Sequence, residues 1–192
     1  MSDLKINNIT DRTGDSGTVI AGVSTVTSTG AFTVASGPTS HRGGRGRGIF
    51  NIGETSPTYV NTLNYITIAA LGNSADFGDL TVIRNMGGAC SSATRGVFIS
   101  GGTTPNANTD VIDYVTIATL GDALDFGNLT ETTRNTCAAG STTRAVRTGG
   151  YVEQATMDYV QISTTGNAID FGDLVTAKRA ISGLSNGHGG LG

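Results

Sequence analysis

Aspartates at a fixed spacing are the side chains of this sequence that could most readily do chemistry. The motif DFGDL starts at Asp76, returns as DFGNL at Asp125 and returns as DFGDL at Asp170. In protein kinases such an Asp binds magnesium, but that chemistry also needs a glycine-rich loop, a strand lysine and an HRD segment. These companions are missing here, so the tandem copies predict a structural role in which Asp bonds backbone amides and Gly lies at a bend. The phenylalanines of the motif are then expected to be packing anchors: Phe77, Phe126 and Phe171.

Calcium binding is the second chemistry that these oxygen-bearing side chains could support. The candidates are Asn73, Asp76, Asp79, Asp122, Asp125, Asp170 and Asp173. Their spacing matches neither an EF-hand loop nor the nonapeptide calcium repeat. We therefore expect them to cap turns, and we expect no metal site and no cofactor.

Nucleophiles and histidines do not form a recognisable constellation. Cys90 and Cys137 fall near corresponding places in two repeats and outside any CxxC or Cys/His cluster, which favours small buried thiols. His41 and His188 are single residues in glycine-rich contexts, so no catalytic triad is indicated. A polysaccharide depolymerase would need a carboxylate pair distinct from the repeated Asp set, and none stands out. We expect a protein that is not an enzyme, with no catalytic residue and with unknown binding residues.

Nucleic acid and membrane are not indicated as partners. The segment HRGGRGRG (41–48) is similar to a short RGG-type nucleic-acid segment. However, Arg47 has the register of Arg95 and Arg144, where a strand begins, so a flexible hinge that feeds the first strand is favoured. A formal net charge of −3 gives no footprint for phosphate or anionic lipid. No apolar run approaches the roughly 18 residues of a membrane-spanning helix.

Repeats are the elements that must position these residues. Tyr65, Tyr114 and Tyr159 are separated by 49 and 45 residues, and the motif aspartates follow the same spacing. A period of about 45 to 50 residues is typical of propeller blades. We therefore divide the chain into an N-terminal β arm (1–40) and three repeats (41–93, 94–143 and 144–192).

Strand patterns indicate an all-β chain. Charged residues make up only 14% of the sequence and glycines number 29, a composition rich in turns and poor in helix formers. Around Tyr65, Leu63 alternates with Ile66 and Ile68, so both faces of the strand are apolar. Such a strand needs sheets on both sides, as in a blade flanked by other blades.

The repeats resemble kelch-like repeat proteins encoded by viruses of marine cyanobacteria, known as tail-fibre or other virion structural proteins. The resemblance is carried by IDYVTIATLGDALDFGNLT from Ile112, NYITIAALGNSADFGDLT from Asn64, ACSSATRGVF from Ala89 and the lead-in KINNITDRTG from Lys5. The glycine pairs Gly101-Gly102 and Gly149-Gly150 fit kelch repeats, although the chain has no Trp. The resemblance implies a kelch-like array of propeller-like blades in a virion component, and no enzyme.

A non-enzymatic phage structural protein is therefore the expected function: a fibre, tail, neck or capsid-decorating subunit that self-assembles through its β repeats and docks by its N-terminal arm. Its partners would be other virion proteins, and its location the virion, after synthesis in the host cytoplasm. The alternative is an adhesin that recognises a host surface glycan or protein through the loops 54–61 and 102–110, which vary between repeats.

Self-association as a dimer or trimer is expected from counting strands. Three repeats are fewer than the about four to eight blades of a closed propeller, and an open array exposes strand edges. We interpret the strand from Arg47 as a surplus strand and the third repeat as cut short at HGGLG from His188. The surplus strand could complete a neighbour's last sheet in a head-to-tail dimer, or join a three-fold assembly.

Overall fold

The computed structural model describes residues 46–51, 53–55, 58–68, 70–104 and 107–185. Within these ranges the chain contains strands and turns but no helix, which confirms the predicted all-β class. The strands are β1 (Arg47–Asn51), β2 (Glu54–Thr55), β3 (Thr58–Tyr59), β4 (Thr62–Thr67), β5 (Ala75–Asp79), β6 (Gly88–Ser91), β7 (Arg95–Thr103), β8 (Ala107–Thr116), β9 (Leu124–Thr133), β10 (Cys137–Gly140), β11 (Arg144–Thr148), β12 (Gln154–Gln161) and β13 (Ile169–Lys178).

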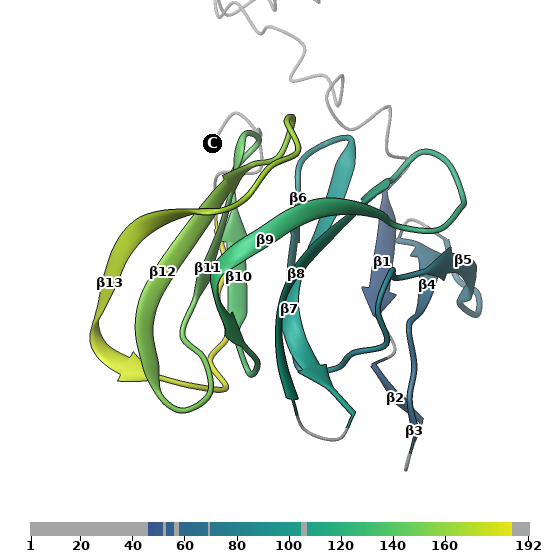
Figure 1. Cartoon of the computed structure of the whole chain (residues 1–192). Helices are drawn as coiled ribbons and strands as arrows, with labels where there is room; N and C mark the ends of the chain where they lie inside the picture. Colours follow the sequence, from purple (N-terminus) through teal and green to yellow (C-terminus); the bar gives the residue numbers. More distant parts are fainter. Residues whose placement is uncertain (1–45, 52, 56–57, 69, 105–106, 186–192) are drawn as a thin grey trace, which may run out of the picture. The chain divides into compact units, whose positions relative to one another are not determined.

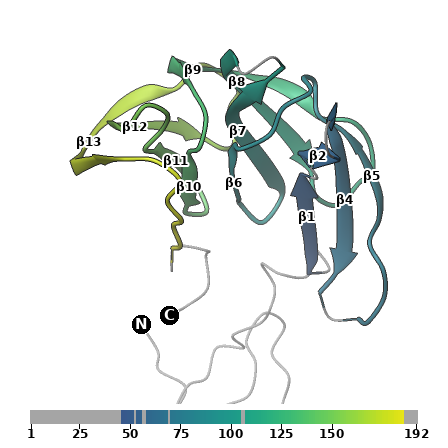
Figure 2. The same ribbon diagram turned by 90° about the horizontal axis from the view of Figure 1, so that it is seen from below.

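Three antiparallel sheets of three or four strands follow one another along the described chain (Figures 1 and 2). Sheet 1 has the order β1-β4-β5, sheet 2 the order β6-β7-β8-β9, and sheet 3 the order β10-β11-β12-β13, while β2 and β3 form a separate hairpin. Each sheet ends with the same three elements: the strand that begins with an Arg, the tyrosine strand, and the DFG strand. No sheet closes on itself among the described residues.

The strand that starts at Arg47 is not surplus, and this prediction is wrong. β1 pairs with β4, with Ile49 opposite Tyr65, just as β7 pairs with β8, with Val97 opposite Tyr114. Strands close in the chain usually pair antiparallel, and only the β2–β3 hairpin separates β1 from β4. By the same pairing sheet 3 is complete with four strands, so the prediction of a third repeat cut short is also wrong.

The short strands β6 and β10 open sheets 2 and 3, ahead of the Arg strand. Sheets 2 and 3, which cover 88–133 and 137–178, therefore begin one strand earlier than the second and third repeats drawn from the sequence, whereas sheet 1 (47–79) lies within the first repeat. Sheet 1 has no counterpart of β6 and β10 among the described residues.

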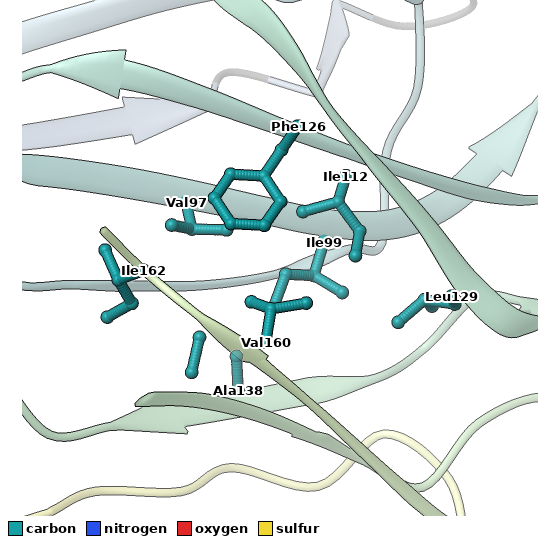
Figure 3. Close-up of a cluster of buried hydrophobic side chains, with 9 residues drawn as sticks. Val97, Ile99, Ile112, Phe126, Leu129, Ala138, Val160 and Ile162 are labelled. Carbon is teal, nitrogen blue, oxygen red and sulfur yellow. The ribbon is translucent and has the colours of Figure 1, made fainter. Parts of the chain in front are cut away.

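Two hydrophobic clusters fill the spaces between consecutive sheets. Leu63 and Phe77 of sheet 1 meet Phe98 and Val115 of sheet 2 in the first cluster. The second cluster joins sheets 2 and 3 (Figure 3) and consists of Val97, Ile99, Ile112, Phe126, Leu129, Ala138, Ala145, Val160 and Ile162. Strand β8 contributes to both clusters, which confirms that this tyrosine strand buries both of its faces.

Other sequence predictions fall on hairpins or outside the described residues. Strands β2 and β3 pair within 54–61, and β7 and β8 extend as far as Thr103 and Ala107 within 102–110. The N-terminal arm (1–40), His41 and His188 lie outside the described residues. Across the described ranges there is no helix that could span a membrane.

Candidate assembly interface

The DFG strand of one sheet packs against the next sheet through its phenylalanine. Phe77 is buried at the first junction, where sheets 1 and 2 meet. Phe126 is buried at the second junction, where sheets 2 and 3 meet. Each ring meets the tyrosine of its own sheet edge-on, with centroids 6.0 Å apart for Tyr65–Phe77 and 5.8 Å apart for Tyr114–Phe126. Edge-to-face pairs stabilise beyond simple burial. Two of the three predicted packing anchors are confirmed.

The glycine of the motif lets two backbones touch at each junction. A Cβ on Gly78 would lie 2.4 Å from the carbonyl oxygen of Gly121, and a Cβ on Gly127 would lie 2.4 Å from that of Gly166. Both motif glycines also have a positive φ, +143° for Gly78 and +144° for Gly127. Residues with a Cβ rarely adopt this conformation. A larger residue would therefore push the next sheet away.

Backbone hydrogen bonds join the DFG strand to a loop of the next sheet. The Gly121 N–H donates to the Phe77 carbonyl at 2.9 Å, and the Ala123 N–H donates to the Asp79 carbonyl at 2.8 Å. The second junction repeats both bonds, from Gly166 to Phe126 at 2.8 Å and from Ala168 to Asn128 at 2.8 Å. The outward backbone groups of β5 and β9, which are edge strands of their own sheets, are thus satisfied by the neighbouring sheet.

A side-chain oxygen in the same loop completes the contact. Asp122 Oδ1 accepts the Asp79 N–H at 3.0 Å, and Asn167 Oδ1 accepts the Asn128 N–H at 3.1 Å. Asp122 was predicted to cap a turn, and the cap that it makes crosses between sheets. The available signal was the Gly-Asp or Gly-Asn pair that begins four residues before every DFG motif.

The aspartate of the motif itself has a smaller role than predicted. Asp76 and Asp125 are exposed, and neither side chain makes a backbone hydrogen bond among the described residues. Asp170 Oδ1 does accept the Gly172 N–H, at 3.2 Å, within its own turn. Within the described ranges no group of three or more side chains has the arrangement of a metal site.

In sheets 1 and 2 the arginine that begins the Arg strand reaches across to the next sheet. Arg47 lies over the ring of Tyr65, 5.1 Å from its centroid, and donates to the Ile117 carbonyl of sheet 2 at 2.7 Å. The same two contacts are made by Arg95 with Tyr114 (4.6 Å) and with the Ile162 carbonyl (3.0 Å). Stacking on the ring fixes the plane of the guanidinium, so its N–H groups are aimed at the next sheet.

One buried ion pair, Arg84–Asp113, stabilises the first junction. Both side chains are almost fully buried, and a guanidinium nitrogen of Arg84 lies 2.9 Å from Asp113 Oδ2. The hydroxyl of Thr81, which follows β5, donates to Asp113 Oδ1 at 2.6 Å. Burial lowers the pKa of the Arg84 guanidinium, and the Asp113 carboxylate opposes that shift. Breaking such a pair would leave a buried charge without compensation.

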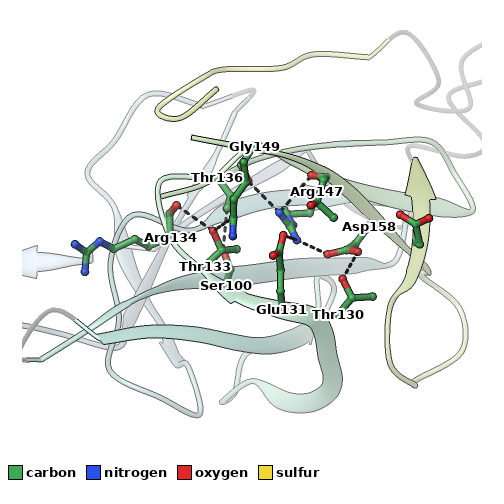
Figure 4. A network of polar contacts seen from close by, with 12 residues as sticks. Ser100, Thr130, Glu131, Thr133, Arg134, Thr136, Arg147, Gly149 and Asp158 are labelled. Carbon is green, nitrogen blue, oxygen red and sulfur yellow. Dashed lines mark hydrogen bonds and ion pairs between the residues drawn. The ribbon is translucent and has the colours of Figure 1, made fainter. Parts of the chain in front are cut away.

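The second junction has a related network (Figure 4). The Thr130 hydroxyl of β9 donates to Asp158 Oδ1 of β12 at 2.6 Å. Asp158 also pairs with Arg147, and both side chains are fully buried. Arg147 in turn contacts Glu131 at 3.3 Å and donates to the Gly149 carbonyl at 3.0 Å. A threonine and an aspartate thus meet across both junctions.

Sheet 3 has the same Arg, Tyr, Phe and Gly residues that contact the next sheet at the two junctions, but it meets no further sheet among the described residues. Arg144 lies 4.9 Å from the centroid of Tyr159, and Phe171 meets the same ring edge-on at 5.9 Å. Phe171 is nevertheless 48% exposed, whereas Phe126 is 2% exposed. Gly172 keeps a positive φ of +126°, although no atom lies within 4 Å of the place of its Cβ. We call this surface the end face; it consists of Arg144, Tyr159, Phe171, Gly172 and Asp173.

Sheet 1 has the residues equivalent to those with which sheets 2 and 3 contact the preceding sheet. In sheet 1 these side chains are exposed. Ile68 is 67% exposed, although Ile162 at the equivalent position is 1% exposed. Phe50 is 51% exposed, whereas Phe98 at the equivalent position is buried. Gly72 and Asn73 are equivalent to Gly121 and Asp122, two residues of sheet 2 that bond to the preceding DFG strand. We call this surface the start face; it consists of Phe50, Ile66, Ile68, Gly72 and Asn73.

The two faces differ from the internal junctions in one respect. Val175 stands where the junctions have a threonine, and Asn64 stands where they have an aspartate. A neutral amide leaves no uncompensated charge when it is buried, and none when it is uncovered again. The faces can therefore be exposed or covered without gaining or losing an ion pair.

The two cysteines are free thiols, as predicted, and only Cys137 is fully buried. Burial raises the pKa of the Cys90 thiol to about 12, and the neighbouring Cys137 adds to the shift. Burial also raises the pKa of Cys137. Both side chains are protonated at neutral pH and pack as small apolar groups.

Comparisons with known proteins do not identify a family. The sequence matches no protein-family model and no curated protein. The resemblance to cyanobacterial virus proteins therefore stays a prediction.

Proposed function

We propose that the chain is a non-enzymatic structural subunit of a virus particle, built from kelch-like, propeller-like blades, that joins further copies of itself end to end. The observation that carries this proposal is the uncovered end face, whose groups have the same arrangement as those that grip the next sheet at both internal junctions. The exposed edge strand β13 and its exposed apolar side chains favour pairing with another chain.

The contact is head to tail because the end face and the start face differ from each other. Such a heterologous contact continues from copy to copy until a ring closes. Closed propellers have about four to eight blades, so two copies of this three-sheet chain fall within that range. A three-fold assembly is the second stoichiometry, and it would need a different, fibre-like arrangement.

A place in the virion is supported by the resemblance of the repeats and by the lead-in KINNITDRTG, which lies in the arm proposed to dock onto other virion proteins. The test is to raise antibodies against the chain and label purified particles of the virus that encodes it. Gold particles at one fixed site, fibre, neck or capsid, are the expected result. A chain that is made during infection but absent from purified particles would contradict the proposal.

A receptor-binding role is the second candidate, favoured by the unequal hairpins of the repeats. The β7–β8 pair extends to Thr103 and Ala107, whereas β11 ends at Thr148. Among the described residues, only sheet 1 has a separate hairpin, β2–β3, between its Arg strand and its tyrosine strand. Hairpins that differ on a repeated scaffold are places where recognition can evolve. Binding of the purified protein to host cells, lost when 103–107 is replaced by Asn-Gly, would favour this role.

A further inference from the structure

Sheet 1 lacks one strand that its neighbours have. In sheets 2 and 3 the Arg strand is covered on one edge by β6 or β10, whereas in sheet 1 β1 is the edge strand among the described residues. Beside this edge lies a pocket of about 260 Å³. It is lined by Arg47, Gly48 and Ile49 of β1, by Ala89, Cys90 and Ser91 of β6, and by Gly96, Phe98 and Ile117. The pocket therefore lies where a first strand of sheet 1 would be.

The chain after β13 repeats the approach to β6 and β10. Met86, Asn135 and Ala180 each have a positive φ, of 57°, 55° and 51°, and each lies ten residues after the Asp of a DFG motif. The Asn135 N–H donates to the Met86 carbonyl at 2.7 Å, and the Ala180 N–H donates to the Asn135 carbonyl at 2.9 Å. The three residues thus form one series of equivalent corners. β6 begins two residues after Met86, and β10 two residues after Asn135.

Residues 182–184 hold the corresponding place after Ala180, and they belong to no strand of the described chain. They lie against β10, because a Cβ on Gly183 would be 2.9 Å from Cys137 Sγ. β6 lies against β10 in the same close way, since a Cβ on Gly88 would be 2.8 Å from the Ala138 nitrogen. Leu184 is 92% exposed. The segment is therefore stacked like a first strand, but no strand of the described residues pairs with it.

We propose that residues 182–184 of one copy add to the β1 edge of a second copy and serve as the missing first strand of its sheet 1. This inference rests on the head-to-tail assembly proposed above. The register follows from the equivalent pairs, in which Cys90 faces Val97 and Ala139 faces Val146. Leu184 then faces Ile49 of the second copy, and Ser182 faces Asn51. Addition of a strand to a free edge supplies backbone hydrogen bonds, while a pocket accepts the side chain.

The pocket suits this occupant by its chemistry. Its β6 wall consists of Ala89, Cys90 and Ser91, which are small enough to let another strand stack closely. Leu184 would meet Phe98 and Ile117, apolar residues that line the same pocket. A second copy is the occupant because a ring of the same chain's three sheets would be smaller than closed propellers of about four to eight blades.

Disulfide cross-linking between two distinguishable copies tests the register. Residues opposite each other in an antiparallel pair lie within disulfide reach. In a background of Cys90→Ala and Cys137→Ala, one copy carries Ile49→Cys and the other carries Leu184→Cys, and the two are co-expressed. Mild oxidation should shift both chains from the mass of one chain to twice that mass. Each variant alone, and Leu184→Cys with the exposed Leu120→Cys, should stay at single-chain mass.

A second pair, Asn51→Cys with Ser182→Cys, keeps the test independent of any damage done by replacing Ile49. The proposal is overturned if neither mixture cross-links, or if cross-linking occurs only within one chain that carries both cysteines. Sedimentation of the same samples separates the two ideas. Oligomers without a cross-link would refute strand addition and leave head-to-tail assembly standing, whereas monomers would refute both.

Discussion

Gly127 in β9 lies so close to Gly166 in the next sheet that a Cβ on Gly127 would be 2.4 Å from the Gly166 carbonyl oxygen. The same relationship joins Gly78 to Gly121 at the preceding junction. The DFG motif is therefore a device for contact between sheets: its Phe fills the junction, and its Gly admits the backbone of the neighbour. Gly172 at the end face keeps the same conformation without a neighbour among the described residues.

Substitution of the motif glycine should depend on its position in the array. Gly127→Ala forces a Cβ against backbone and adds strain at positive φ, so the free energy of unfolding should fall by about 2 to 4 kcal/mol. Gly172→Ala is the matched variant, with strain of about 1 kcal/mol and no clash within the chain. Urea unfolding of both variants in the Phe171→Asp background, in which copies should not join and cover Gly172, measures the difference. Equal losses would show that the close approach at Gly127 does not matter.

The buried ion pair of the first junction should be costly to break on one side. Asp113→Asn leaves the Arg84 guanidinium buried without its counter-ion, which should cost about 3 to 5 kcal/mol. Replacing both partners, as Arg84→Met with Asp113→Asn, should recover much of that loss, since no buried charge is left. Chemical unfolding of the single and double variants provides the measurement. A double variant less stable than Asp113→Asn would refute this account of the junction.

The two aspartates near the second motif should differ in their effects. Asp122→Ala removes the cap on the Asp79 N–H between sheets and should cost about 1 kcal/mol. Asp125→Ala changes an exposed side chain and should stay within about 0.5 kcal/mol of the unsubstituted chain. Thermal melts of the two variants side by side decide this, and the reverse order would return the capping role to the motif Asp.

Thiol reactivity should report the raised pKa of Cys90, a partly buried side chain. Its pKa of about 12 lies above the ordinary value of 9.0, so at pH 9 the fraction present as thiolate is roughly a thousandth. Alkylation by iodoacetamide should be slow in the folded protein and fast in urea, and mass spectrometry of the Cys90 peptide measures both rates. Because the folded pKa is the higher one, this group's contribution to stability is present below pH 9 and is lost as the pH rises towards 12. Rapid alkylation of Cys90 in the native protein at pH 8 would contradict the raised pKa.

The repeat period and the buried phenylalanines were predictable because they depend on side-chain types that recur in the sequence. Tyr114 and Phe126, for example, recur at one spacing and pack in one way. The pairing of the Arg47 strand was not predictable in the same way, since an Arg strand could follow one tyrosine strand or precede the next. The alternation of apolar residues is identical in both cases. Only the register of β1 with β4 decides between them.

The contacts between sheets were the hardest part to foresee, because most of them are made by the backbone. A carbonyl that accepts a hydrogen bond, as Phe77 does from Gly121, leaves no trace in residue type. The only sequence signs are the glycines that allow the approach and the Asp or Asn that caps it. The crossing of Arg95 to the Ile162 carbonyl was hidden for the same reason.

The mass of the protein in solution tests most directly whether the end face and the start face join copies. Light scattering at micromolar concentration should give a multiple of the 19.5 kDa chain mass. Phe171→Asp places a charge in the end face, so it should shift the mass to that of one chain while the circular dichroism spectrum stays unchanged. The matched variant Leu120→Asp, at an exposed apolar residue outside both faces, should keep the oligomer. A single-chain mass for the unsubstituted protein, or an oligomer that survives Phe171→Asp, would contradict the account.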